Sequence, residues 1–111
     1  MDVFQALAEP TRRDIIQLLA RSGQLPATDI YNKFSVSPPA VCQHLKVLRE
    51  AELVQVEKRG QQHLYYINPA AMRELEEWAR QTRQMWTQRF DALDTLLAVE
   101  KKKLSKKKHG K

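Results

Sequence analysis

Ser37, Gln43 and Lys46 are the residues whose types and spacing first suggest a chemistry for this chain of 111 residues. On a helix, Gln43 and Lys46 lie on one face because they are three residues apart. A glutamine amide can make a bidentate contact with adenine, and a lysine can donate to guanine or to a phosphate. Ser37 can bind a phosphate together with the free N–H groups of the first helical turn. The pattern indicates hydrogen bonding to a nucleic acid.

A second group of basic and polar residues surrounds a turn at Gly60. Leu53–Lys58 alternates apolar and polar residues, and His63–Ile67 is rich in β-favouring residues, so two strands are predicted. They form a hairpin with a basic tip, which suits phosphate contact or insertion into a minor groove. The tip residues are Lys58, Arg59, Gln61 and Gln62. The alternative is a solvated tip without a role.

Gln43 and Lys46 are expected on a helix that runs from Pro38 to about Ala51. Ser37 suits the N-cap, and Pro38 suits the first helical position, where its missing N–H costs nothing. Three apolar residues lie within about 60° of one another at ~100° per residue and face the core, opposite Gln43 and Lys46. They are Val41, Leu45 and Leu48.

Shorter helices precede this one. Asp2–Ala8 is a short apolar segment, and further helices are predicted from Pro10 or Thr11 to about Arg21 and over Ala27–Phe34. The link Ser35–Ser37 joins the last of these to the Pro38 helix. With the hairpin, these elements predict a winged helix-turn-helix, an α+β and mainly helical fold with a two-stranded wing. The helix after the turn enters the major groove in that arrangement.

Asn68 and Pro69 open a long helix that is predicted to end near Val99, roughly 45 Å away at ~1.5 Å per residue. Its apolar stripe is longer than one small domain can cover, so we expect a second copy of the chain as its partner. The stripe could instead line an effector pocket, but methionine and aromatic residues at helical spacing are more often core.

The net charge of +6 comes entirely from the end of the chain. Residues 1–99 hold twelve Lys and Arg and twelve Asp and Glu, whereas residues 100–111 hold seven Lys and one Glu. We therefore expect a folded domain over 1–99 and a disordered lysine-rich tail over 100–111. The tail either adds salt-sensitive DNA affinity, which we favour, or only solubilises the protein.

Composition excludes several classes of protein. The length suits one domain, no apolar run approaches the ~20 residues of a membrane span, and the first residues lack a secretory signal pattern. The single cysteine excludes a disulfide framework and indicates a reducing cytoplasm. No phosphate loop, glycine-rich nucleotide motif, nucleophile elbow or Cys–His or Ser–His–Asp set occurs, so we predict no enzyme.

Several spaced motifs occur in a specific order: Leu7–Arg13, Ser37–Ala51, Leu53-Val54 and Tyr65–Ile67. In this order they resemble the ArsR/SmtB family of bacterial transcriptional regulators, and Trp86–Leu93 resembles a subgroup with a long tryptophan-bearing C-terminal helix. The resemblance implies a homodimer built on the first and last helices. It also implies a partly palindromic operator in the bacterial nucleoid and, usually, repression.

On this basis two sets of residues are predicted. The DNA-binding set is Ser35, Ser37, Pro38, Pro39, Cys42, Gln43, His44, Lys46, Arg49, Lys58, Arg59, Gln61 and Gln62. The dimer-interface set is Val3, Phe4, Leu7, Leu75, Trp78, Met85, Trp86, Phe90, Leu93 and Leu97.

The chain departs from the family pattern at informative positions. Metal-sensing members carry cysteines before the turn, whereas Gln24–Asp29 has neither cysteine nor histidine, and the last helix lacks the family's zinc ligands. We therefore predict no metal and no cofactor, and the resemblance leaves any small-molecule effector open. Glu52 stands where the family has glycine, at a cost of about 1 kcal/mol if the position is left-handed.

Alternatives stay open for single residues and for the whole chain. Cys42 is either a redox switch or, as we favour, a passive small residue. His44 either contacts phosphate or packs beside the core. A protein-interaction module and a non-specific nucleoid-associated DNA binder are the competing functions, and polar and basic residues on the Pro38 helix favour a sequence-specific DNA-binding repressor over both.

Overall fold

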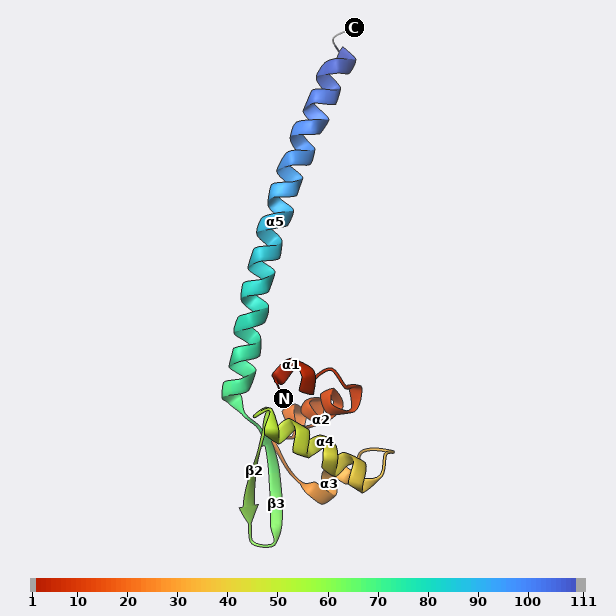
Figure 1. The fold of residues 1–111 in the computed structure, drawn as a ribbon, viewed down its shortest axis with the longest axis vertical. Coiled ribbons are helices and arrows are strands. Elements are labelled where there is room, and N and C mark those ends of the chain that lie inside the picture. The colour runs from red at the N-terminus through yellow and green to blue at the C-terminus, as the bar shows by residue number, and fades with distance from the viewer. Residues whose placement is uncertain (1, 110–111) are drawn as a thin grey trace. The chain divides into compact units, whose positions relative to one another are not determined.

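The computed structural model describes residues 2–109 and the surroundings of side chains as far as Lys101. The chain divides into a first compact unit that ends at Leu75 and a second that begins at Glu76. The elements of the first unit are α1 (Val3–Ala6), α2 (Pro10–Ser22), β1 (Gln24–Pro26), α3 (Ala27–Tyr31), α4 (Pro38–Glu50), β2 (Val54–Arg59) and β3 (Gln62–Ile67). Helix α5 (Pro69–His109) begins in the first unit and continues through the second (Figure 1).

The sheet has three antiparallel strands in the order β1-β3-β2, so a third strand that the sequence did not predict joins the predicted two-stranded wing. The hairpin of β2 and β3 is present as predicted, with Arg59 opposite Gln62. Strand β1 adds to the free edge of β3, with Leu25 opposite Tyr65. Three residues that end in proline are too few to show an alternating pattern, and Pro26 is tolerated because the strand lies at an edge.

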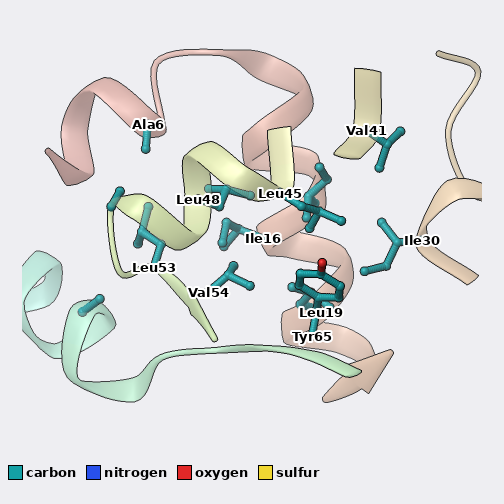
Figure 2. Packing of buried hydrophobic residues seen from close by; sticks show 13 residues of the cluster. Ala6, Ile16, Leu19, Ile30, Val41, Leu45, Leu48, Leu53, Val54 and Tyr65 are labelled. Carbon is teal, nitrogen blue, oxygen red and sulfur yellow. The ribbon is translucent and has the colours of Figure 1, made fainter. Parts of the chain in front are cut away.

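Buried side chains from the helices and strands of the first unit form one hydrophobic core (Figure 2). Ile15 and Leu19 come from α2 and Ile30 from α3, and all three are at most 1% exposed. The predicted core face of α4 is confirmed, because Val41, Leu45 and Leu48 are fully buried. Leu53 and Val54 close the core where the chain enters β2.

Polar caps define the ends of the helices. Glu9 accepts a hydrogen bond from the N–H of Arg12 at the start of α2, and Asp2 forms a capping box with Gln5 in α1. Helix α3 ends at Tyr31, three residues before the predicted Phe34. Beyond Tyr31 the backbone continues in tighter turns, with the N–H of Phe34 bonded to the carbonyl of Tyr31.

Helix α4 ends in a Schellman motif. The N–H of Leu53 donates to the carbonyl of Leu48 over 3.0 Å, and the N–H of Glu52 donates to the carbonyl of Arg49 over 2.9 Å. Glu52 has a φ of 61°, so the position is left-handed and the condition on which a cost was predicted for glutamate is met. Its carbonyl accepts a 2.8 Å hydrogen bond from the amide of Asn68, which fixes the chain before α5.

The second unit consists of the remainder of α5. Glu77 and Arg80 form an exposed ion pair one turn apart, which lowers the pKa of Glu77 and raises that of Arg80. Trp86 and Phe90 pack edge to face with ring centroids 5.3 Å apart. The helix ends at His109, ten residues beyond the predicted end at Val99. The side chains of residues 102–111 lie outside the described part, so the predicted disorder of residues 100–111 stays a prediction.

Candidate nucleic-acid interface

Helix α4 presents its polar side chains by burying the opposite face. Ser37 caps its first turn and accepts a 3.4 Å hydrogen bond from the N–H of Ala40, and Pro38 occupies the first helical position. Both features were predicted from the sequence. Because Val41, Leu45 and Leu48 anchor the helix in the core, its outward face is fixed relative to the rest of the first unit.

The exposed face of α4 carries side-chain hydrogen-bonding groups that have no partner among the described residues. Gln43, Lys46 and Arg49 are all exposed. Over the described residues, neither Lys46 nor Arg49 forms an ion pair. Their donors are available to an external acceptor such as a base edge or a phosphate oxygen. Four residues at the entry to the helix are also exposed: Ser35, Ser37, Pro38 and Pro39.

His44 points away from this face, toward the start of α2. Its Nδ1 lies 3.4 Å from Nη1 of Arg12 and 3.8 Å from Oε2 of Glu9. Partial burial raises the pKa of Glu9, but the N–H of Arg12 and the charge of His44 outweigh it and hold that pKa below its ordinary value. These contacts favour the packing alternative for His44, which stays a prediction.

Arg12 links His44 to the first helix. Its guanidinium donates to the carbonyls of Gln5 and Ala6 at the end of α1. These contacts join α1, α2 and α4 through one side chain. No local sequence pattern indicates this link, because Arg12 and His44 are 32 residues apart.

Cys42 is held at the other edge of α4 by Tyr31. The hydroxyl of Tyr31 donates to Sγ of Cys42 over 3.6 Å. This hydrogen bond, together with desolvation, raises the pKa of Tyr31 to about 12. The thiol therefore serves as a partner for α3, which fits a passive role better than a redox switch.

The hairpin tip is exposed and turns tightly. Gly60 has a φ of 59° and is the first of two loop residues between Arg59 and Gln62, as in a type II′ turn. Arg59 pairs with Glu57 at 3.4 Å, whereas Lys58 forms no ion pair within the described part of the chain. Gln61 and Gln62 line one side of an open cleft of about 350 Å³ that Thr28 and Tyr31 border from α3.

The predicted interface residues fall into two groups. Val3, Leu7 and Leu75 are partly buried against the core of the first unit, so packing inside the protomer already uses part of their surface. Phe4 is 49% exposed. The remaining residues of the set are on α5 and are 49% to 62% exposed: Trp78, Met85, Trp86, Phe90, Leu93 and Leu97.

The described residues offer neither a metal site nor a membrane-spanning helix. Nowhere in residues 2–101 do three or more His, Cys, Asp or Glu side chains gather in a way that could hold a metal ion. No described helix is long and apolar enough to cross a membrane.

Comparison with known proteins decides the family. A model of the bacterial regulatory proteins of the arsR family matches residues 9–56. The transcriptional repressor SdpR of Bacillus subtilis is 35% identical over 77 residues, which cover 69% of this chain and 84% of SdpR. The chain belongs to the ArsR family. This ArsR-family protein is therefore a DNA-binding transcriptional regulator and not an enzyme, as the sequence predicted.

Other relatives of this ArsR-family protein agree. The regulator Rv2034 of Mycobacterium tuberculosis is 42% identical over 69 residues, 62% of this chain and 64% of Rv2034. Among solved structures, an ArsR-like transcriptional regulator from Rhodococcus sp. RHA1 superposes with a TM-score of 0.72 at 26% identity, over 85% of this chain and 88% of that one. The predicted winged helix-turn-helix fold is confirmed.

Proposed function

We propose that this regulator is a homodimeric repressor that occupies a two-fold symmetric operator in a promoter of the bacterial chromosome. Helix α4 of each protomer enters the major groove, and the β2–β3 hairpin lies against the adjacent backbone or minor groove. The observation that carries the proposal is the exposed polar face of α4, which stands directly opposite three fully buried residues.

The contacts divide by chemistry. Gln43 and Lys46 read base edges, because their side chains are exposed near the middle of α4. Ser37 and the first-turn N–H groups of α4 bind a phosphate, and Arg49 and Lys58 add phosphate contacts. Pro38 and Pro39 shape the entry to the groove. We assign His44 to support of α4, since Glu9 and Arg12 hold its ring.

Repression and dimerisation rest on two further supports. The related SdpR is itself a transcriptional repressor. The exposed apolar side chains of α5 form a surface that a second copy would cover. A two-fold dimer presents two α4 helices, which requires two half-sites about one helical turn apart on the DNA, ~34 Å.

Fluorescence anisotropy with labelled DNA from upstream of the protein's own gene tests the proposal. At physiological salt, we expect binding that survives an excess of scrambled competitor of the same length and composition. Such binding indicates a sequence-specific, autoregulatory repressor. Complete displacement by the scrambled DNA, here and on a library of genomic fragments, would refute sequence-specific recognition and leave non-specific DNA binding.

A further inference from the structure

The link that leads into α4 carries an apolar side chain that the first unit leaves to water. Among residues 2–75, the large apolar side chains that stay exposed are Phe4 at 49% and Val36 at 38%. Phe4 belongs to α1, whereas Val36 lies in the bend between Ser35 and Ser37. Among the described residues, Val36 belongs neither to the buried core nor to the apolar residues packed against it. Its side chain is therefore available to a partner outside the protomer.

The first turn of α4 continues this apolar character. Pro38 and Pro39 are both exposed. A proline has no N–H, so at these two positions the helix offers ring carbons in place of hydrogen-bond donors. Val36, Pro38 and Pro39 lie within four consecutive positions. Single exposed apolar residues are normal on a protein surface, but three together at the start of the proposed recognition helix form a small apolar patch.

Pro39 shares the outward strip of α4 with the two residues that we propose read base edges. At ~100° per residue, Pro39, Gln43 and Lys46 fall within about 60° of one another, opposite the buried face. Pro39 precedes Gln43 by four residues, so about 6 Å of helix separates them at ~1.5 Å per residue. Successive base pairs are ~3.4 Å apart. Pro39 therefore faces a base pair at most two steps from the one that Gln43 contacts.

Only one group in the major groove suits an apolar surface of this kind. The base edges there present hydrogen-bond donors and acceptors, except that thymine also presents its C5 methyl group. A valine side chain and a proline ring form no hydrogen bonds, and a polar group that is buried against them without a partner loses free energy. The patch at the start of α4 therefore favours thymine over cytosine, which lacks the methyl group and presents an amino group in the groove.

We propose that Val36 and Pro39 contact thymine methyl groups in each half-site, within two base pairs of the base that Gln43 reads. The inference rests on the proposed function and adds to it a base that is selected by apolar contact. Specificity then has two parts along one strip of α4, a hydrogen-bonding part at Gln43 and Lys46 and an apolar part at the entry.

Replacement of thymine by uracil in the DNA tests the contact. Deoxyuridine pairs with adenine as thymidine does and lacks only the methyl group. The probe is the genomic duplex whose binding survives scrambled competitor, prepared with thymine and with uracil in both half-sites. A buried methyl group contributes about fourfold in affinity, so two half-sites should make the native chain bind the uracil duplex about ten- to twentyfold more weakly. Uracil at one position at a time then locates the thymine that matters.

A protein variant assigns the effect to the patch. Val36→Ser combined with Pro39→Ser removes the apolar groups, and because both side chains are exposed the change leaves the core intact. This variant should bind the thymine duplex more weakly and bind the two duplexes with dissociation constants within about twofold of each other. Gln43→Ala is the matched control on the same strip. It should lower affinity for both duplexes and retain the full penalty for uracil.

The possible outcomes separate this inference from the proposed function. Displacement of the native chain from every genomic duplex by scrambled DNA would refute the proposed function itself. Specific binding with equal affinity for the thymine and uracil duplexes would refute the methyl contact alone. A full uracil penalty that persists in the double serine variant would place the methyl sensitivity elsewhere in the complex and overturn the assignment to Val36 and Pro39.

Discussion

Replacement of Glu52 by glycine should stabilise the protein. Glu52 has a φ of 61°, a conformation in which a side chain costs roughly 1–2 kcal/mol and glycine costs nothing. Its backbone groups bond to Arg49 and Asn68, so the position cannot relax without loss of the Schellman motif. Glycine also gains freedom in the unfolded chain, which offsets about 0.4–1 kcal/mol of the benefit. A net gain of about 0.5–1 kcal/mol is expected for Glu52→Gly.

Urea denaturation, followed by circular dichroism at one fixed protomer concentration, measures this gain, because dimerisation couples stability to concentration. Glu52→Ala is the control, since it removes the carboxylate but keeps the Cβ that causes the strain. It should show no stabilisation, and Glu52→Asn should lie between the two because asparagine tolerates left-handed backbone. If the glycine variant proves no more stable than the alanine variant, the strain at this position is not what limits stability.

Four further predictions concern DNA binding and stability. Gln43→Ala should weaken operator binding by ~1–3 kcal/mol in anisotropy titrations and leave binding to scrambled DNA nearly intact; an equal loss on both sequences would remove Gln43 from base recognition. A chain that ends after Glu100 should bind all DNA more weakly with a flatter salt dependence, and an unchanged salt slope would reduce the lysine-rich tail to a solubiliser. Arg12→Gln should lower the free energy of unfolding by roughly 1–2 kcal/mol, because it leaves the partly buried carbonyl of Ala6 without a donor, and more than Arg13→Gln, whose acceptors are solvated. Because the pKa of Glu9 is lowered in the folded protein, its carboxylate stabilises the fold at pH values above the ordinary pKa of 4.5, and this contribution is lost as the pH falls through the folded pKa. The native chain should therefore be more stable than Glu9→Gln near neutral pH and lose that advantage in acid. Parallel profiles of stability against pH for the two proteins would contradict this.

The elements that could be predicted from the sequence are those with local signals. Helix α4 combines an N-cap serine, a proline at its first position and a periodic apolar face, and it begins at the predicted residue. The hairpin combines alternation with a glycine at the turn, and Gly60 has the positive φ that such a turn requires. The cost at Glu52 was predicted only on the condition of a left-handed backbone, because the family has glycine there, and the φ of 61° meets that condition. In each case a few adjacent residues determine the backbone.

Long-range contacts explain what the sequence did not reveal. Strand β1 exists because Leu25 pairs with Tyr65, a residue forty positions away, and three residues carry no periodicity. The support of His44 by Arg12 and of Cys42 by Tyr31 also joins separate helices. The neighbouring helices α2 and α3 contact the two edges of the polar face of α4, at His44 and Cys42. Gln43, Lys46 and Arg49 on the same face remain exposed to solvent.

The balance of charges determines how such a protein can bind DNA. Residues 1–99 carry equal numbers of acidic and basic groups, so no general positive field attracts the folded part to DNA. Binding must come from where individual cations lie: Lys46 and Arg49 on α4, and Lys58 and Arg59 at the hairpin. Nε of Arg59 lies 3.4 Å from Oε1 of Glu57, so Arg59 must break this ion pair to reach a phosphate. Because we propose that Lys46 reads a base edge, the other cations of a dimer offer about four to six phosphate contacts without its tails, and at ~0.9 counterions each the expected salt slope of the folded part is about −4 to −5. In the proposed complex those few contacts position α4, and discrimination between sequences by hydrogen bonding then depends on Gln43 and Lys46.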